Sequence, residues 1–128
     1  MKTITLVIGA FYGLLSVVLG AFGAHAFKKI LSPERLESFE TGVKYQMYAA
    51  LFLLIVGYIL KFETKTENWI SWLMIFGTLL FSVSIYFLSF QNYWGVSLKF
   101  LGPITPLGGM MMIISWFLLM LYFWKTKF

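Results

Sequence analysis

The sequence predicts an all-α, polytopic membrane protein, an antiparallel bundle of four transmembrane helices in a single domain over residues 1–128. Hydrophobic residues make up 60% of the chain and charged residues only 12%, about half the share of an ordinary soluble domain. Four apolar stretches are each long enough to cross a bilayer, which takes about 20 residues. A soluble domain of this length has too little interior to bury four such helices. We expect the spans at residues 4–27, 43–60, 69–90 and 104–124.

The first span carries a stripe of small residues at alternating spacings of four and three, which places them on one helix face. In lipid, small residues let helix backbones approach closely and gain packing contacts. We interpret the stripe as a packing face, directed either toward another helix of the same chain, which we favour, or toward a second copy. The stripe consists of Gly9, Gly13, Ser16, Gly20 and Gly23.

The first span also resembles a secretory signal with a small-residue cleavage site around His25. It is longer than the usual apolar core of a signal, so we expect a retained span.

The segment that follows predicts a short interfacial amphipathic helix over residues 33–41, between spans one and two. Leu36 and Phe39 lie three residues apart with charged residues around them, and Gly42 is expected to mark a bend into the second span. A plain polar loop is the alternative. The start of the helix is marked by a capping residue, a proline and an acid, Ser32-Pro33-Glu34.

The third and fourth spans carry further packing residues. Ser82 and Ser84 lie in the middle of span three, where their hydroxyls are expected to bond backbone or a neighbouring helix. Residues 102–109 open span four with two prolines and then the pair Gly108 and Gly109. This segment is either a broken helix that lines a site or, as we favour, two prolines that simply start the helix.

Polar side chains are expected to gather on one side of the membrane, where spans one and three end and spans two and four begin. His25 is the sole histidine, and it suits a structural hydrogen bond, a proton or ligand contact, or a metal. The alternative for the whole group is ordinary solvation of helix ends. The expected ligand-binding cluster consists of His25, Glu40, Thr41, Lys44, Tyr45, Gln46 and Thr105.

Several chemistries lack the residues they need. The chain has no cysteine, no carboxylate inside a predicted span and no nucleophile–base set, so we expect no metal site, no cofactor, no catalytic residue and no enzymatic function. The net charge of +5 comes from Lys and Arg at span ends, where they meet lipid phosphates, so we expect no nucleic-acid binding. These basic residues divide five against five between the two sides, which leaves the orientation open.

Four segments carry a combined pattern that is more specific than any one of them, residues 20–26, 39–46, 81–86 and 101–109. In this order they resemble the domain-of-unknown-function 423 family, small bacterial inner-membrane proteins with a mitochondrial transmembrane relative. The resemblance covers essentially the whole chain and implies four spans in the bacterial cytoplasmic membrane, without an established activity. Two positions depart from the family pattern: Ala49 stands where many members have a histidine, and Val83 where a glycine is often seen. A paired-histidine metal or heme site with His25 is therefore not expected here.

Two functions follow as expectations. The first is an accessory, scaffold or assembly subunit that acts through helix packing, with membrane lipids and either a second copy or another membrane protein as partners. The alternative is a binder or conductor of a small hydrophobic ligand, a lipid, a quinone-like molecule or an ion, at the one-sided polar cluster.

Overall fold

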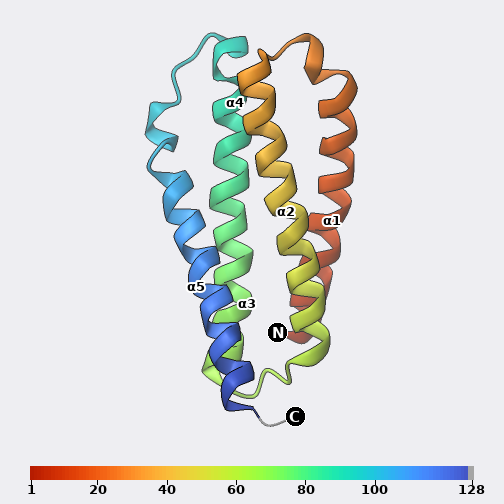
Figure 1. The fold of residues 1–128 in the computed structure, drawn as a ribbon, viewed down its shortest axis with the longest axis vertical. Coiled ribbons are helices and arrows are strands. Elements are labelled where there is room, and N and C mark those ends of the chain that lie inside the picture. Colours follow the sequence, from red (N-terminus) through yellow and green to blue (C-terminus); the bar gives the residue numbers. More distant parts are fainter. Residues whose placement is uncertain (127–128) are drawn as a thin grey trace.

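The computed structural model describes residues 1–126, whose helices run along one long axis (Figure 1). The third rod is continuous but changes its winding in the middle, where a π-helical turn, η2, joins α3 to α4. In chain order the elements are α1 (Lys2–His25), η1 (Phe27–Lys29), α2 (Pro33–Ile59), α3 (Lys65–Thr78), η2 (Leu79–Val83), α4 (Ser84–Trp94), η3 (Lys99–Leu101) and α5 (Ile104–Lys125).

Four of the described rods are long and apolar enough to cross a membrane, which confirms the predicted all-α, four-span fold. Apolar side chains face outward: only 22% of the most apolar window of α1 is buried, and Leu14 and Val17 are more than half exposed. Hydroxyls face inward instead, because lipid offers them no hydrogen bond. The Ser115 hydroxyl, for example, donates to the Ile70 carbonyl across α5 and α3 at 2.6 Å.

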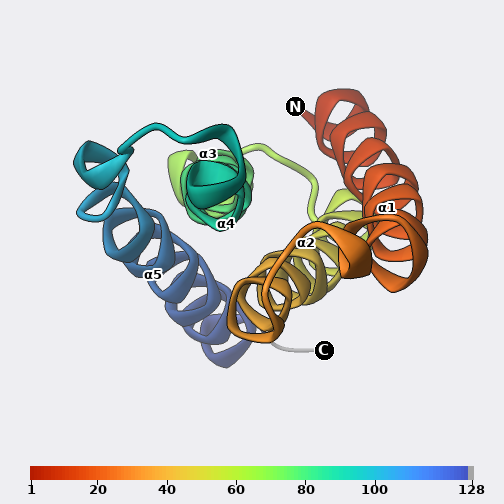
Figure 2. The ribbon, with the colours of Figure 1, turned by 90° about the horizontal axis from the view of Figure 1, so that it is seen from above.

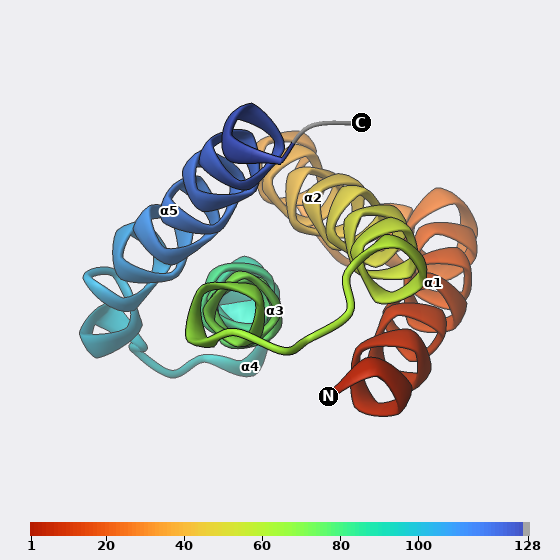
Figure 3. The same cartoon turned by 90° about the horizontal axis from the view of Figure 1, so that it is seen from below.

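The helices form two packed pairs. α1 packs along α2, and α5 packs along the third rod. Viewed from either end, the third rod stands in the angle between α5 and the α1–α2 pair (Figures 2 and 3). The N-terminus, the described C-terminal end of α5 and the α2–α3 connection lie at one end of the bundle (Figure 1).

The small-residue stripe of α1 lies against α2. A Cβ added to Gly9 would stand 3.0 Å from the Leu53 Cβ, and one added to Gly23 would stand 3.2 Å from the Phe39 ring. Backbones this close gain dispersion contacts that larger residues would prevent. The structure thus places the stripe inside the chain.

The crossing of α3 and α5 is closer still. A Cβ on Gly108 would clash with the Phe81 backbone nitrogen and lie 2.7 Å from the Gly77 carbonyl oxygen. The neighbouring Gly109 would make only an ordinary contact, at 3.5 Å from the Phe81 ring. Gly108 is therefore required by this crossing, whereas Gly109 is not.

Residues 33–41 do not form a separate interfacial helix; they are the first turns of α2, which runs without a bend through Gly42. Ser32 caps the helix as expected, because its hydroxyl accepts the Arg35 N–H at 3.2 Å. Phe39 is 1% exposed, and the Ser82 hydroxyl donates to the Gly42 carbonyl at 2.8 Å. The predicted break is wrong because these turns pack against α1 and α4, which keeps them upright in the bundle.

The two prolines at residues 103 and 106 start α5 and do not break it. Pro103 precedes the first helical residue, Ile104, and Pro106 occupies the first turn, where a missing backbone N–H costs nothing. Both glycines that follow lie in regular helix. The described backbone is therefore not broken within α5.

A carboxylate closes the connection between α2 and α3. The Glu67 carboxylate accepts hydrogen bonds from the backbone N–H groups of Lys61 and Phe62, both at 2.9 Å. It also accepts from the Thr64 backbone N–H at 3.2 Å and from the Thr64 hydroxyl at 2.9 Å. Phe62 has a φ of 57°, a strained value for a bulky residue. The four hydrogen bonds of Glu67 hold this turn in place.

Candidate ligand cavity

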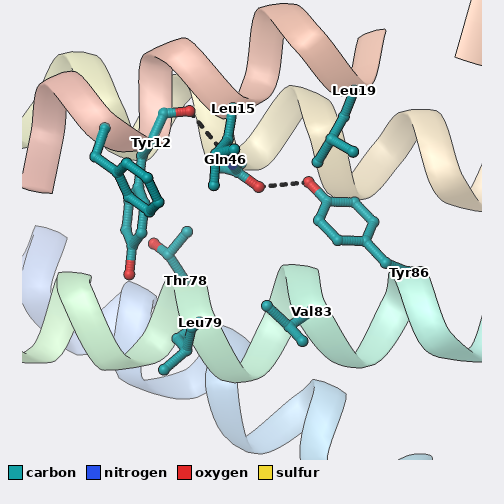
Figure 4. Close-up of a pocket in the computed structure, with 9 residues that line it drawn as sticks. Tyr12, Leu15, Leu19, Gln46, Thr78, Leu79, Val83 and Tyr86 are labelled. Carbon is teal, nitrogen blue, oxygen red and sulfur yellow. Dashed lines mark hydrogen bonds between the residues drawn. The ribbon is translucent and has the colours of Figure 1, made fainter. Parts of the chain in front are cut away.

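Gln46 lies at the middle of α2, thirteen residues from each end of Pro33–Ile59, and not near the membrane surface where the sequence suggested it. It is 5% exposed. Its side-chain Nε2 donates to the Tyr12 carbonyl at 3.0 Å, and the Tyr86 hydroxyl donates to its Oε1 at 2.6 Å (Figure 4). A carbonyl only accepts, so these two partners fix which way the amide points.

Beside Gln46 is a cavity of about 270 Å³ between α1, α2 and the third rod, which we call the inner cavity (Figure 4). Phe11 and Leu79 at its border are 51% and 44% exposed, so it opens sideways toward lipid. Its lining residues are Phe11, Tyr12, Leu15, Leu19, Gln46, Thr78, Leu79, Val83 and Tyr86.

The inner cavity forms because α1 diverges from the third rod on the C-terminal side of Tyr12, which is toward the top of Figure 1. Below that point two contacts join them: the hydroxyls of Thr5 and Ser71 share a hydrogen bond, and the Tyr12 hydroxyl donates to the Ile75 carbonyl at 2.7 Å. In the described chain the backbone of α1 approaches α3 but neither η2 nor α4, the later part of the third rod. The cavity occupies the resulting space.

Thr78 is one of the residues that line the inner cavity, and its hydroxyl has no partner in residues 1–126. Its side chain is 1% exposed, and its hydroxyl makes no hydrogen bond. A buried threonine in a helix ordinarily bonds the carbonyl one turn earlier. The Gln46 amide likewise uses only one of its two N–H donors. Both side chains therefore have hydrogen-bonding capacity left for a ligand.

The wall that carries Leu79 and Val83 is the π-helical turn η2. Single π turns inside α-helices are rare and occur frequently at functional sites, because they displace side chains from the regular helical register. Here the irregular turn begins directly after Thr78. The π turn thus supplies two of the lining residues and interrupts the regular α-helical register next to the unpartnered Thr78 hydroxyl.

None of the 9 residues that line the inner cavity is charged. An ionised ligand group would lie in low dielectric without a counter-charge, which is strongly unfavourable. A neutral molecule avoids that cost, and the surface that the lining residues expose to the cavity is almost wholly apolar. The cavity is therefore suited to an uncharged, mostly apolar molecule.

The one-sided cluster expected from the sequence does not come together. His25, Glu40 and Lys44 are exposed, and each lacks a hydrogen bond or ion pair in the described residues. Lys44 and Gln46 are two residues apart, so they point to nearly opposite faces of a continuous helix.

The remaining members of that cluster have local partners. The Thr41 hydroxyl donates to the Glu37 carbonyl at 3.1 Å, and Tyr45 packs edge-on against Tyr48 and Phe81. The hydroxyl of Thr105 pairs with that of Ser84, between α5 and α4. Of the seven expected residues, only Gln46 lines the inner cavity.

The sequence analysis did not group the other polar lining residues, Tyr12, Thr78 and Tyr86, with Gln46. The available signal was a single amide and a few hydroxyls inside apolar stretches, since a polar residue at mid-membrane depth is costly unless it has a role. Assigning Gln46 to the end of a span concealed that signal.

The fold defines a small polytopic helical membrane protein. Comparison with known sequences agrees: the family described as "Protein of unknown function (DUF423)" matches residues 19–109, and the chain belongs to it. A UPF0382 membrane protein of Staphylococcus epidermidis is 38% identical over 116 residues, covering 91% of both chains. The UPF0382 membrane protein YwdK of Bacillus subtilis is 40% identical over 116 residues, covering 89% of this chain and 90% of the relative. No solved structure matches the chain.

Proposed function

We propose that this protein binds a neutral, membrane-soluble ligand whose carbonyl or hydroxyl group contacts Gln46 and Thr78 in the inner cavity. The observation that carries the proposal is the buried, unpartnered Thr78 hydroxyl beside an amide that two hydrogen bonds hold in position. Leaving a buried hydroxyl unpaired costs about 1–3 kcal/mol. A ligand that pairs with it offsets that cost, which favours binding at this point.

The proposal concerns binding and not catalysis. The lining side chains offer one amide, one threonine hydroxyl and two tyrosine hydroxyls, and three of these four, all except the threonine hydroxyl, are engaged in hydrogen bonds that hold the helices together. No nucleophile with an adjacent base is among the cavity's lining residues. Binding, carrying or sensing a lipid-soluble molecule requires no such pair.

We place the protein in the bacterial cytoplasmic membrane. The relatives reported above are bacterial membrane proteins, and proteins of the bacterial outer membrane are typically β-barrels, not helical bundles.

The accessory or scaffold role, with a second copy or another membrane protein as partner, comes second. The stripe that suggests it is covered by α2, so it offers no free packing face. Crosslinking in native membranes tests this role, because a stable assembly would yield a crosslinked partner.

A titration followed by ¹⁵N NMR tests the binding proposal. The chain has only two glutamines, so the side-chain amide of Gln46 is read directly and that of Gln91 is an internal control. Dodecan-2-one is added to the delipidated, micelle-bound protein, and n-dodecane is the matched probe without oxygen. We expect the ketone alone to shift the Gln46 amide saturably, with Gln91 unchanged.

Substitution of Thr78 completes the test. Thr78→Val keeps the shape and removes the hydroxyl, and one hydrogen bond of about 1.4 kcal/mol corresponds to a tenfold weaker ketone affinity. Thr41→Val, which alters an exposed hydroxyl, is the control. Equal responses to ketone and alkane, or an unchanged affinity in Thr78→Val, would reject the proposal.

A further inference from the structure

A second cavity, of about 350 Å³, adjoins the inner cavity and is called the outer cavity here. Leu19 and Tyr86 line both, so the two spaces share a wall. The outer cavity extends to Phe27 in η1 and to Trp94, the last residue of α4. The two cavities together therefore lead from mid-depth to one face of the bundle, over about 12 Å between Tyr86 and Trp94 along α4 at 1.5 Å per residue.

The outer cavity is apolar and open along one side, where Phe87 and Trp94 are nearly half exposed. Apart from Leu19 and Tyr86 it is lined by four phenylalanines and Trp94. Phe27 meets Phe39 and Phe90 edge-on, with ring centroids 5.2 and 4.9 Å apart, and Phe90 stacks on Trp94 at 5.4 Å. Rings held by one another in this way lose little freedom when a ligand binds.

The inner cavity is too small to hold a whole ligand of ordinary size. Sites for whole small molecules measure roughly 300–1,000 Å³, and the inner cavity, at about 270 Å³, lies below that range. It holds a polar group and a few carbons, so the remainder of the molecule lies elsewhere. The outer cavity is the adjoining space, and its lining suits hydrocarbon.

We propose that the outer cavity holds the hydrocarbon chain of the ligand whose polar group contacts Gln46 and Thr78. This inference rests on the proposed function and specifies its ligand class: a neutral, single-chain amphiphile, bound with its polar end at mid-depth. Its chain runs past Tyr86 toward Phe27 and Trp94. This orientation is the reverse of that of a bilayer lipid, whose polar group lies at the surface.

A spin-labelled ketone locates the chain. An alkan-2-one with a nitroxide at the far end of its chain is bound to the full-length protein in micelles, and the indole N–H signals of the tryptophans are recorded. We expect broadening of the Trp94 signal, reversed by excess dodecan-2-one, while Trp69 and Trp124, near the opposite face of the bundle, stay sharp. Equal broadening of all three would overturn the inference and indicate ordinary lipid contact.

Phe87 provides a second, independent test because it lines the outer cavity and not the inner cavity. Phe87→Ala is expected to weaken dodecan-2-one binding at least threefold and to leave butan-2-one binding unchanged. Equal weakening of both ketones, or of neither, contradicts the chain subsite. A Gln46 response without Trp94 broadening leaves the proposed function standing and rejects this inference, whereas loss of the Gln46 response rejects both.

Discussion

At the scale of one residue, substitution of Thr78 is expected to change stability and ligand affinity in opposite directions. Its hydroxyl is buried without a partner, so Thr78→Val removes a desolvation cost and no bond. We expect the free energy of unfolding to rise by about 1 kcal/mol in the ligand-free protein, because unsatisfied buried polar groups cost about 1–3 kcal/mol. Unfolding in mixed micelles by an anionic detergent measures the change.

Ser115→Ala is the contrasting variant. Its hydroxyl donates to the Ile70 carbonyl, so its removal is expected to lower the free energy of unfolding by about 0.6 kcal/mol, the average for such bonds in lipid. A loss of stability in Thr78→Val, similar to that in Ser115→Ala, would show that Thr78 has a structural partner and no role toward a ligand.

Glu67 supports the turn between α2 and α3. In Glu67→Gln the new NH₂ group must face either the backbone N–H groups of Lys61 and Phe62 or the backbone N–H of Thr64. In both orientations a donor then opposes a donor. We expect a loss of about 2 kcal/mol in unfolding free energy, since hydrogen bonds to a charged group contribute about 1.5–3 kcal/mol. The exposed Glu63→Gln, measured alongside, is expected to stay within about 0.5 kcal/mol of the wild type. Equal effects of the two substitutions would contradict this account.

The sequence predicted local residue roles better than it predicted which residues meet. The Ser32 cap and the bonding of Ser82 to a neighbouring helix follow from residue type and position, and the structure shows both. The pairing of Gln46 with Tyr12 and Tyr86 depends on three helices at once, so no single segment reveals it.

At the scale of the element, the adjacent Gly108 and Gly109 of α5 allow the effect of close helix packing to be compared with that of helix propensity. Gly108→Ala puts a methyl group into backbone atoms of the third rod, and such overpacking costs about 1–3 kcal/mol. Gly109→Ala meets only ordinary contacts and gains up to about 1 kcal/mol from helix propensity. We expect the first variant to unfold more readily and the second to be as stable as the wild type or more so. Equal stabilities would contradict the close crossing of α3 and α5.

The length of α2 shows what hydropathy does not detect. The apolar stretch begins at Val43, which led to a predicted interfacial helix over residues 33–41 and placed Gln46 near the surface. The glutamates of those turns are exposed, Arg35 reaches the Leu88 carbonyl of α4, and Phe39 and Gly42 are buried. Average polarity hides such a division between two faces. The resulting error in the depth of Gln46 moved the expected site to the wrong level of the membrane.

The whole molecule makes a prediction about sidedness. The connection between α2 and α3 lies at one end of the bundle and that between α4 and α5 at the other (Figure 1). Because the chain has no cysteine, Glu63→Cys and Ser97→Cys each introduce a single thiol at an exposed position. We expect a membrane-impermeant maleimide to label one of the two in intact cells, and not both, and to label the other after permeabilisation. Labelling of both in intact cells would contradict the four-span topology.

The number of spans was predictable from the sequence because lipid imposes it through length and hydropathy alone. The inner cavity was not, because it arises where α1 departs from the third rod. That departure depends on which residues the two helices bring into contact, such as Tyr12 with Ile75, and on the irregular turn at η2. Both are properties of the assembled bundle and not of any one helix.

An experimental structure of the protein, purified from its native membrane without delipidation, tests the central claim most directly. The account predicts elongated non-protein density between α1 and the third rod, with one end within hydrogen-bonding distance of Thr78 and Gln46. A structure in which α1 closes onto α4 and the Thr78 hydroxyl bonds the Met74 carbonyl, leaving no space for a ligand, would contradict it.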